Sequence, residues 1–136
     1  MWQLAWFFRK RSIDKKIAKG FPISKQDAYL ILKKAISIHR QMIDATWDDP
    51  AISGDDELHK EWIFWYKQII VVVYGGVAFI TLDEAIKRLH HDIHTHQYWI
   101  DYKEKHPDFQ LGYRGSVALH KKWKARWLAI IEIIKE

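Results

Sequence analysis

The stretch "IIVVVYGGVAFITL" (Ile69 to Leu82) decides which class of fold this sequence encodes. Two runs rich in β-branched residues flank Gly75 and Gly76, which is a typical β-hairpin signal. Neither run alternates between apolar and polar residues, so neither shows a solvent-facing side. Upstream, apolar residues at helical spacing lead straight into the first run: Leu58, Trp62, Trp65, Ile69 and Val72 or Val73. We therefore expect one continuous buried helix here, with a helix plus a hairpin as the alternative.

Helix-start signals recur along the rest of the chain. Three of them place Ser or Thr three residues before an acidic residue, and a fourth follows a glycine: Ser24, Ser53, Thr81 and Ser116. Breaks are expected at "GFP" (20–22), "DDP" (48–50), the glycine pair and "HPDF" (106–109). The helices should then cover 2–19, 25–46, 54–74, 82–105 and 117–135. No internal repeat, linker or low-complexity segment stands out.

Length and composition are those of a globular protein. A chain of 136 residues can bury a core as one domain, so we expect a single helical domain over 1–136. The predicted fold is all-α, a bundle of about five helices; the alternative is α+β with one hairpin around Gly75-Gly76. Without cysteine, disulfides and thiolate chemistry are excluded. No secretory signal is visible, and the longest apolar run is shorter than the ~20 residues of a transmembrane helix. We expect a cytoplasmic protein.

Charge is distributed unevenly around the net value of +5. Residues 1–40 carry ten Lys and Arg against two acids, whereas residues 41–66 carry one Lys against seven acids. Basic clusters attract phosphates or acidic membrane surfaces. The simpler interpretation is that the acidic segment lies beside the basic ones and neutralises part of them.

Three histidines fall on the apolar stripes of three predicted helices. His39, His96 and His120 therefore point toward the core, where each is expected to be an ordinary hydrogen-bonded core residue. If they lay at one level of the bundle, they could instead hold a transition metal such as Zn, Mn, Fe or Ni. His90 and His94, one helical turn apart, form a weaker candidate for two metal ligands on a helix surface.

Aromatic and basic residues alternate at both ends of the chain. "WQLAWFFRKR" near the start and "HKKWKARW" near the end are suited to stacking a ring while cations engage phosphates. The candidate ligand-binding residues are Trp2, Trp6, Arg9, Lys10, Arg11, Arg114, Lys121, Lys122, Lys124 and Arg126. Core packing of these tryptophans is the competing interpretation.

The N-terminal segment is apolar on two faces. Trp2, Trp6, Ile13 and Ile17 form one stripe, and Leu4, Phe7 and Phe8 form another on the opposite side. A helix of this kind is embedded, bound to a partner or part of an oligomer contact. If the chain forms a homo-oligomer, we expect the contact to be made through this helix.

No phosphate-binding glycine loop, nucleophile elbow or zinc-protease helix is present. The sequence favours a small, soluble binding protein without catalytic activity and without a cofactor. Its partner would be an anionic ligand (a nucleotide or nucleic acid) or another protein. The alternatives are a metal-dependent hydrolase built on the inward histidines and a peripheral membrane protein that docks through its N-terminal helix.

Overall fold

A computed structural model describes residues 1–46, 56–112 and 115–136, and within these ranges the chain forms helices and no strand. The helices are α1 (Trp2–Ala18), α2 (Lys25–Thr46), α3 (Asp56–Val73), α4 (Leu82–Lys105) and α5 (Val117–Ile134). The all-α prediction is confirmed, and each helix ends within two residues of its expected limits. The predicted break at 48–50, the cap at Ser53 and the candidate ligand residue Arg114 lie outside the described residues.

Gly75 and Gly76 end α3 rather than turn a hairpin. Gly75 has a φ of +74°, a left-handed conformation that glycine adopts without steric cost. The N–H of Gly75 donates to the carbonyl of Val72 at 3.0 Å, and the N–H of Gly76 donates to that of Val71 at 3.0 Å. This pair of bonds is the Schellman arrangement, which satisfies the last carbonyls of a helix. The second β-branched run is therefore loop, and the hairpin alternative is wrong.

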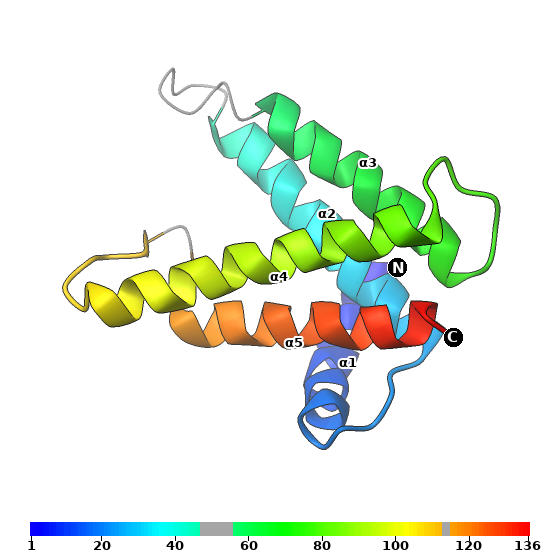
Figure 1. Ribbon diagram of the computed structural model, residues 1–136, viewed down its shortest axis with the longest axis horizontal. Helices are drawn as coiled ribbons and strands as arrows, with labels where there is room; N and C mark the ends of the chain where they lie inside the picture. Colours follow the sequence, from blue (N-terminus) through cyan, green and yellow to red (C-terminus); the bar gives the residue numbers. More distant parts are fainter. Residues whose placement is uncertain (47–55, 113–114) are drawn as a thin grey trace.

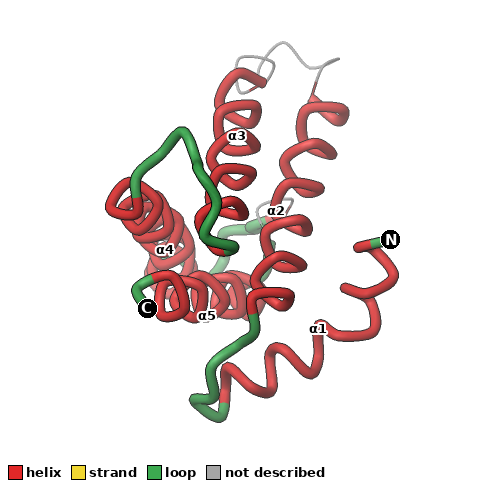
Figure 2. Tube along the Cα trace, turned by 90° about the vertical axis from the view of Figure 1, so that its right-hand side faces the viewer, coloured by secondary structure: helices red, strands yellow, loops and turns green. Residues whose placement is uncertain are grey.

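The helices form two antiparallel hairpins and one additional helix. Figure 1 shows α2 beside α3 and, crossing them at an angle, α4 beside α5. Helix α1 packs against α2 and α5, on the side away from α4 (Figure 2). Side chains from all five helices form one apolar core, in which Ile13, Ile31, Ile69, Leu89 and Trp127 are almost fully buried.

The expected caps position the hairpins. Thr81 forms a complete capping box with Glu84 at the start of α4. Ser24 and Asp27 exchange backbone-to-side-chain bonds in the same way before α2. The Ser116 hydroxyl accepts from the N–H of Leu119 at the start of α5. Each bond satisfies a donor that the first helical turn leaves open.

The expectation that the chain has no internal repeat is wrong, because the two hairpins are copies of one pattern. "LHKEW" (58–62) in α3 matches "LHKKW" (119–123) in α5, and "II" (69–70) matches "II" (130–131). The first helix of each hairpin also matches, with an offset of 57 residues (80 − 23). Identical positions there are Ile23/Ile80, Ala28/Ala85, Leu32/Leu89, Ile36/Ile93 and His39/His96.

The three-dimensional structure repeats in the same register. The matching pairs Ala28/Ala85, Leu32/Leu89, Trp62/Trp123 and Ile69/Ile130 are all buried. Tyr66 and Trp127 occupy equivalent positions, and their rings stack on each other at 5.3 Å with an interplanar angle of 7°. Equivalent side chains meet in this way at a local twofold axis. The bundle is therefore a pseudo-symmetric pair of hairpins to which α1 is added.

Candidate functional site

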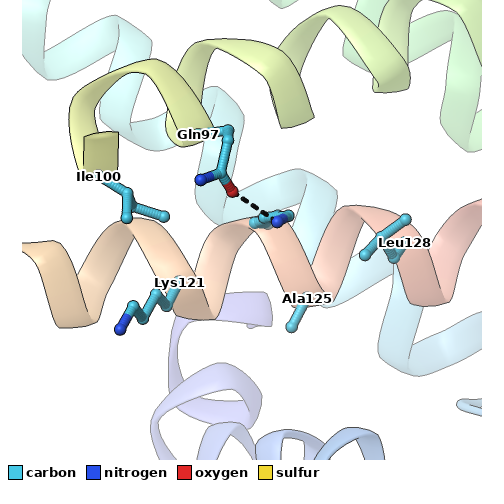
Figure 3. A pocket seen from close by; sticks show the side chains of 6 residues that line it. Gln97, Ile100, Lys121, Ala125 and Leu128 are labelled. Carbon is cyan, nitrogen blue, oxygen red and sulfur yellow. Dashed lines mark hydrogen bonds between the residues drawn. The ribbon is translucent and has the colours of Figure 1, made fainter. Parts of the chain in front are cut away.

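A shallow groove lies between α4 and α5 on the outer side of the second hairpin. Its volume is about 350 Å³, and it is lined by Gln97, Ile100, Lys121, Lys124, Ala125 and Leu128. Figure 3 shows Gln97 reaching from α4 across to Lys124 on α5, where the Lys124 ammonium donates to the Gln97 carbonyl oxygen at 2.6 Å. Three of the lining residues are apolar and two are cations. The groove thus combines an apolar surface with positive charge.

Three of the candidate cations lie at or beside this groove. Lys121 and Lys122 are exposed, and Lys124 is half-buried. No carboxylate of the described residues forms an ion pair with any of the three. Their charge therefore remains available to a ligand.

Arg126 was expected on the same basic surface, and that expectation is wrong. Its side chain is buried, and its guanidinium donates two hydrogen bonds of 2.9 Å to the Asp14 carboxylate. The guanidinium carbon lies 4.8 Å from the ring centroid of Trp6 and 4.7 Å from that of Trp123. Paired and covered on both faces, Arg126 fastens α1 to α5 and cannot reach a phosphate.

The candidate ligand-binding residues on α1 are also of two kinds, some engaged within the protein and some exposed. Trp6 is buried and Trp2 packs against the core, so neither offers a free ring for stacking. Arg9 donates to the buried Asp27 at 2.7 Å. Lys10 and Arg11 are exposed.

Asp27 keeps its charge although no part of it is exposed. Burial opposes ionisation, but the Ser24 backbone bond, the Lys16 bond and the charge of Arg9 outweigh it and lower the pKa of this carboxyl. Lys16 donates to it at 3.2 Å. This network joins α1 to the first turn of α2 and engages Arg9 within the protein.

The inward histidines form two pairs and not one cluster. His96 contacts His120 with 2.8 Å between their Nδ1 atoms, whereas His39 contacts His59 with 2.7 Å. The alternative in which all three inward histidines converge is wrong, because His39 belongs to the other hairpin and pairs with His59. Ring geometry repeats closely, with centroids 5.0 and 5.1 Å apart and interplanar angles of 50° and 51°.

Each pair is a hydrogen bond between imidazoles. One Nδ1 must donate and the other accept, so the pair cannot carry a proton on all four ring nitrogens without opposing two N–H groups. Two nitrogens on one tetrahedral zinc would be separated by about 3.3 Å, given bonds of about 2.0–2.1 Å. The observed spacing is shorter than that. Burial, with the charge of the paired histidine, lowers the pKa of His39 and of His96 to about 4.

The surface pair of histidines also lacks further ligands. His90 and His94 are exposed on α4. Over 1–46, 56–112 and 115–136, no three His, Cys, Asp or Glu side chains are grouped so that they could hold a metal ion. The hydrolase alternative therefore has no ligand set in the part of the chain that the structure describes.

Sequence reasoning missed two polar residues that form side-chain hydrogen bonds between helices, Asp92 and His59. Asp92 accepts a hydrogen bond of 2.8 Å from the Tyr66 hydroxyl inside the core. Burial raises the pKa of Asp92 to about 7, although the Tyr66 bond and the Arg88 charge act in the opposite direction. His59 was missed as well. The repeated "LHK" would have identified it as the counterpart of His120.

Comparisons with family models, with curated proteins and with solved structures find no significant match to this chain. Among the described helices, none has the length and apolar character needed to cross a membrane. The structure itself defines the class as an all-α bundle of duplicated hairpins with a basic groove.

Proposed function

We propose that this protein is a binding protein for a phosphate-bearing ligand of nucleotide size, held in the groove between α4 and α5. The main support for this proposal is a depression of about 350 Å³ in which Lys121 and Lys124 lie beside an apolar lining. Small-molecule sites usually have ~300–1,000 Å³, an apolar lining and a few placed polar groups. Lys121, Lys122 and Lys124 would contact the phosphates, while Ile100 and Leu128 would contact the apolar body of the ligand.

The ionisable groups near the groove form hydrogen bonds within the protein, which supports binding without catalysis. His96 and His120 bond to each other between the helices. Asp92 is engaged by Tyr66 in the core. These groups serve the packing of the bundle, whereas the groove presents amines and hydrocarbon.

The test is titration of the protein with ATP, followed by tryptophan fluorescence or calorimetry, at low and at high salt. We expect saturable binding that weakens with salt, because exposed charges are screened. The Lys121→Glu/Lys124→Glu variant should bind about tenfold more weakly or worse, which corresponds to about 1.4 kcal/mol or more.

The matched control is Lys19→Glu/Lys25→Glu, which makes the same change of charge at exposed positions that do not line the groove. Its affinity should stay close to that of the unmodified protein. Equal weakening in both variants would contradict the site and leave only general electrostatic attraction. Binding of an oligonucleotide but not of ATP would replace the nucleotide by a nucleic acid as the ligand.

A further inference from the structure

The internal repeat shows that one helix-binding surface of the bundle is occupied and its equivalent is open. Helix α1 contacts Asp27 of α2 and Arg126 of α5, and the Arg126 guanidinium also stacks on Trp6 of α1 and on Trp123 of α5. We call the surface formed by Asp27, Trp123 and Arg126 the first seat. Their counterparts in the repeat are Glu84 of α4 and Trp62 and Trp65 of α3. These define the second seat.

The second seat is a depression and not a covered surface. About 300 Å³ of open volume lies there, lined by Trp65, Glu84, Lys87, Arg88 and His91. The Arg88 guanidinium stacks on Trp65 and Trp62, 4.3 and 4.8 Å from the ring centroids. An aromatic ring that entered would meet an indole and the cations of α4, which is a favourable environment.

The outer face of α1 has the features of an occupant. Leu4, Phe7 and Phe8 are 52%, 66% and 71% exposed, although they form a continuous apolar stripe. At ~100° per residue, Arg11 and Lys15 continue the same face toward the C-terminal end of the helix. The face is therefore apolar in its first half and basic in its second half.

Helix α3 carries an aromatic residue of the second seat and, beside it, acidic residues in an order complementary to that of the α1 face. Trp65 stands at the open depression, and Glu61 and Glu57 follow at one and two turns toward the N-terminus of that helix. Glu57 pairs with Lys60 at 3.3 Å and Glu61 pairs with Arg88 at 2.8 Å, and the two glutamates still keep 86% and 51% of their side-chain surface exposed. At ~1.5 Å per residue, Trp65 is about 6–12 Å from these acids along α3, and Phe8 is about 5–11 Å from Arg11 and Lys15 along α1. An antiparallel α1 thus places rings on Trp65 and cations on the two glutamates.

We infer that the second seat binds the outer face of α1 from a second copy of this chain. The contact must form between copies, since α1 is fastened to the first seat of its own chain and lies on the far side of the bundle from α4 (Figure 2). It joins two different surfaces, so association is head-to-tail and lengthens with concentration. The charged half makes it weaken with added salt.

The test is light scattering coupled to size exclusion over a range of concentrations of the full chain. We expect the unmodified protein to increase in mass with concentration. Phe8→Asp on α1 and Trp65→Ala on the second seat should each give a monomer. Phe21→Asp alters an exposed ring outside both surfaces and should associate normally. A monomer at every concentration, or association that survives Phe8→Asp, would overturn the inference.

Mixing separates this arrangement from α1 pairing with α1. Phe8→Asp keeps an intact second seat and Trp65→Ala keeps an intact α1, so an equimolar mixture should form a discrete 1:1 dimer. Circular dichroism of Trp65→Ala is the control that this variant is folded. A variant pair that leaves the core unchanged repeats the test by charge reversal. Arg11→Glu/Lys15→Glu and Glu57→Lys/Glu61→Lys should each be monomeric alone. Their mixture should associate into alternating chains, because each α1 face then meets a second seat of opposite charge. Mixtures that remain monomeric would overturn the inference, and none of these substitutions touches the groove between α4 and α5.

Discussion

As pH falls, two kinds of buried ionisable side chain change the stability of this protein in opposite directions. The pKa of His39 and of His96 is lowered to about 4, so between pH 6.5 and 4 the unfolded chain binds protons that the folded protein excludes. Stability at these residues therefore falls as pH falls. The pKa of Asp92 is raised to about 7, so between pH 7 and 3.8 the folded protein retains a proton that the unfolded chain releases. This carboxyl stabilises the protein as pH falls.

We expect the two histidines to outweigh the single carboxyl. Each histidine changes the free energy of unfolding by on the order of 2 kcal/mol by pH 4, so stability should be lower at pH 4.5 than at pH 7. Asp92→Asn removes the opposing group and should make the decline steeper, and His96→Gln should make it shallower. Urea unfolding at a series of pH values measures all three. Stability that is constant or rises on acidification would contradict the paired, neutral histidines.

The helices themselves follow from local sequence. Periodic apolar stripes placed all five, and side-chain caps set the starts of α2, α4 and α5. The glycine pair was the ambiguous element, because β-branched runs suit a strand as well as a buried helix. The ambiguity was resolved by a stripe that began at Leu58, outside the ambiguous stretch, and by the Schellman bonds of Gly75 and Gly76.

The capping box at the start of α4 should make a measurable contribution to stability. Thr81→Ala removes the acceptor for the Glu84 N–H, and should lower the free energy of unfolding by about 1 kcal/mol. Thr95→Ala is the matched control, because the Thr95 hydroxyl is exposed and bonds only the His91 carbonyl within the same helix. It should change stability by less than about 0.5 kcal/mol. Thermal or urea unfolding compares the two, and equal losses would argue against the cap.

The repeat supplies an internal comparison for the core of the whole molecule. Tyr66 bonds Asp92 across the bundle, whereas their counterparts Trp127 and Ala35 make no such bond. The Trp127 Nε1 atom is buried and has no hydrogen-bond partner among the described residues. Both pairs of equivalent positions combine one residue from each hairpin. One pair forms a hydrogen bond between Tyr66 and Asp92, and the other holds the apolar side chains of Trp127 and Ala35.

We predict that Tyr66 and Asp92 are strongly coupled. Tyr66→Phe leaves a buried carboxyl without its partner and should cost about 2 kcal/mol. Tyr66→Phe/Asp92→Ala makes this pair apolar like the equivalent pair Trp127 and Ala35, and should cost less than the sum of the single changes by about 1 kcal/mol or more. Tyr74→Phe, at a half-exposed tyrosine, is the control and should be nearly neutral. Additive losses in urea unfolding would refute the coupling.

The candidate site was predictable only in part. Lys121, Lys122 and Lys124 fall outside the apolar stripe of α5 and are accessible, as their spacing indicates. Arg126 falls outside the same stripe, yet Asp14, from a helix more than a hundred positions away in the chain, accepts its hydrogen bonds and draws it into the core. No residue near Arg126 in the sequence indicates that Asp14 is its partner.

The sequence by itself determined the helices, their caps and most of the apolar positions that face the core, because these depend on residues three and four positions apart along the chain. Only the tertiary structure decided which inward residues meet. His39 and His96 occupy equivalent places in two copies of one hairpin, and each finds its partner on the neighbouring helix of its own copy. The hairpins meet through equivalent rings, Tyr66 and Trp127, which stack on each other, while each histidine pair stays within its own hairpin. Their separation is set by how the hairpins pack, which is a property of contacts distant in the sequence.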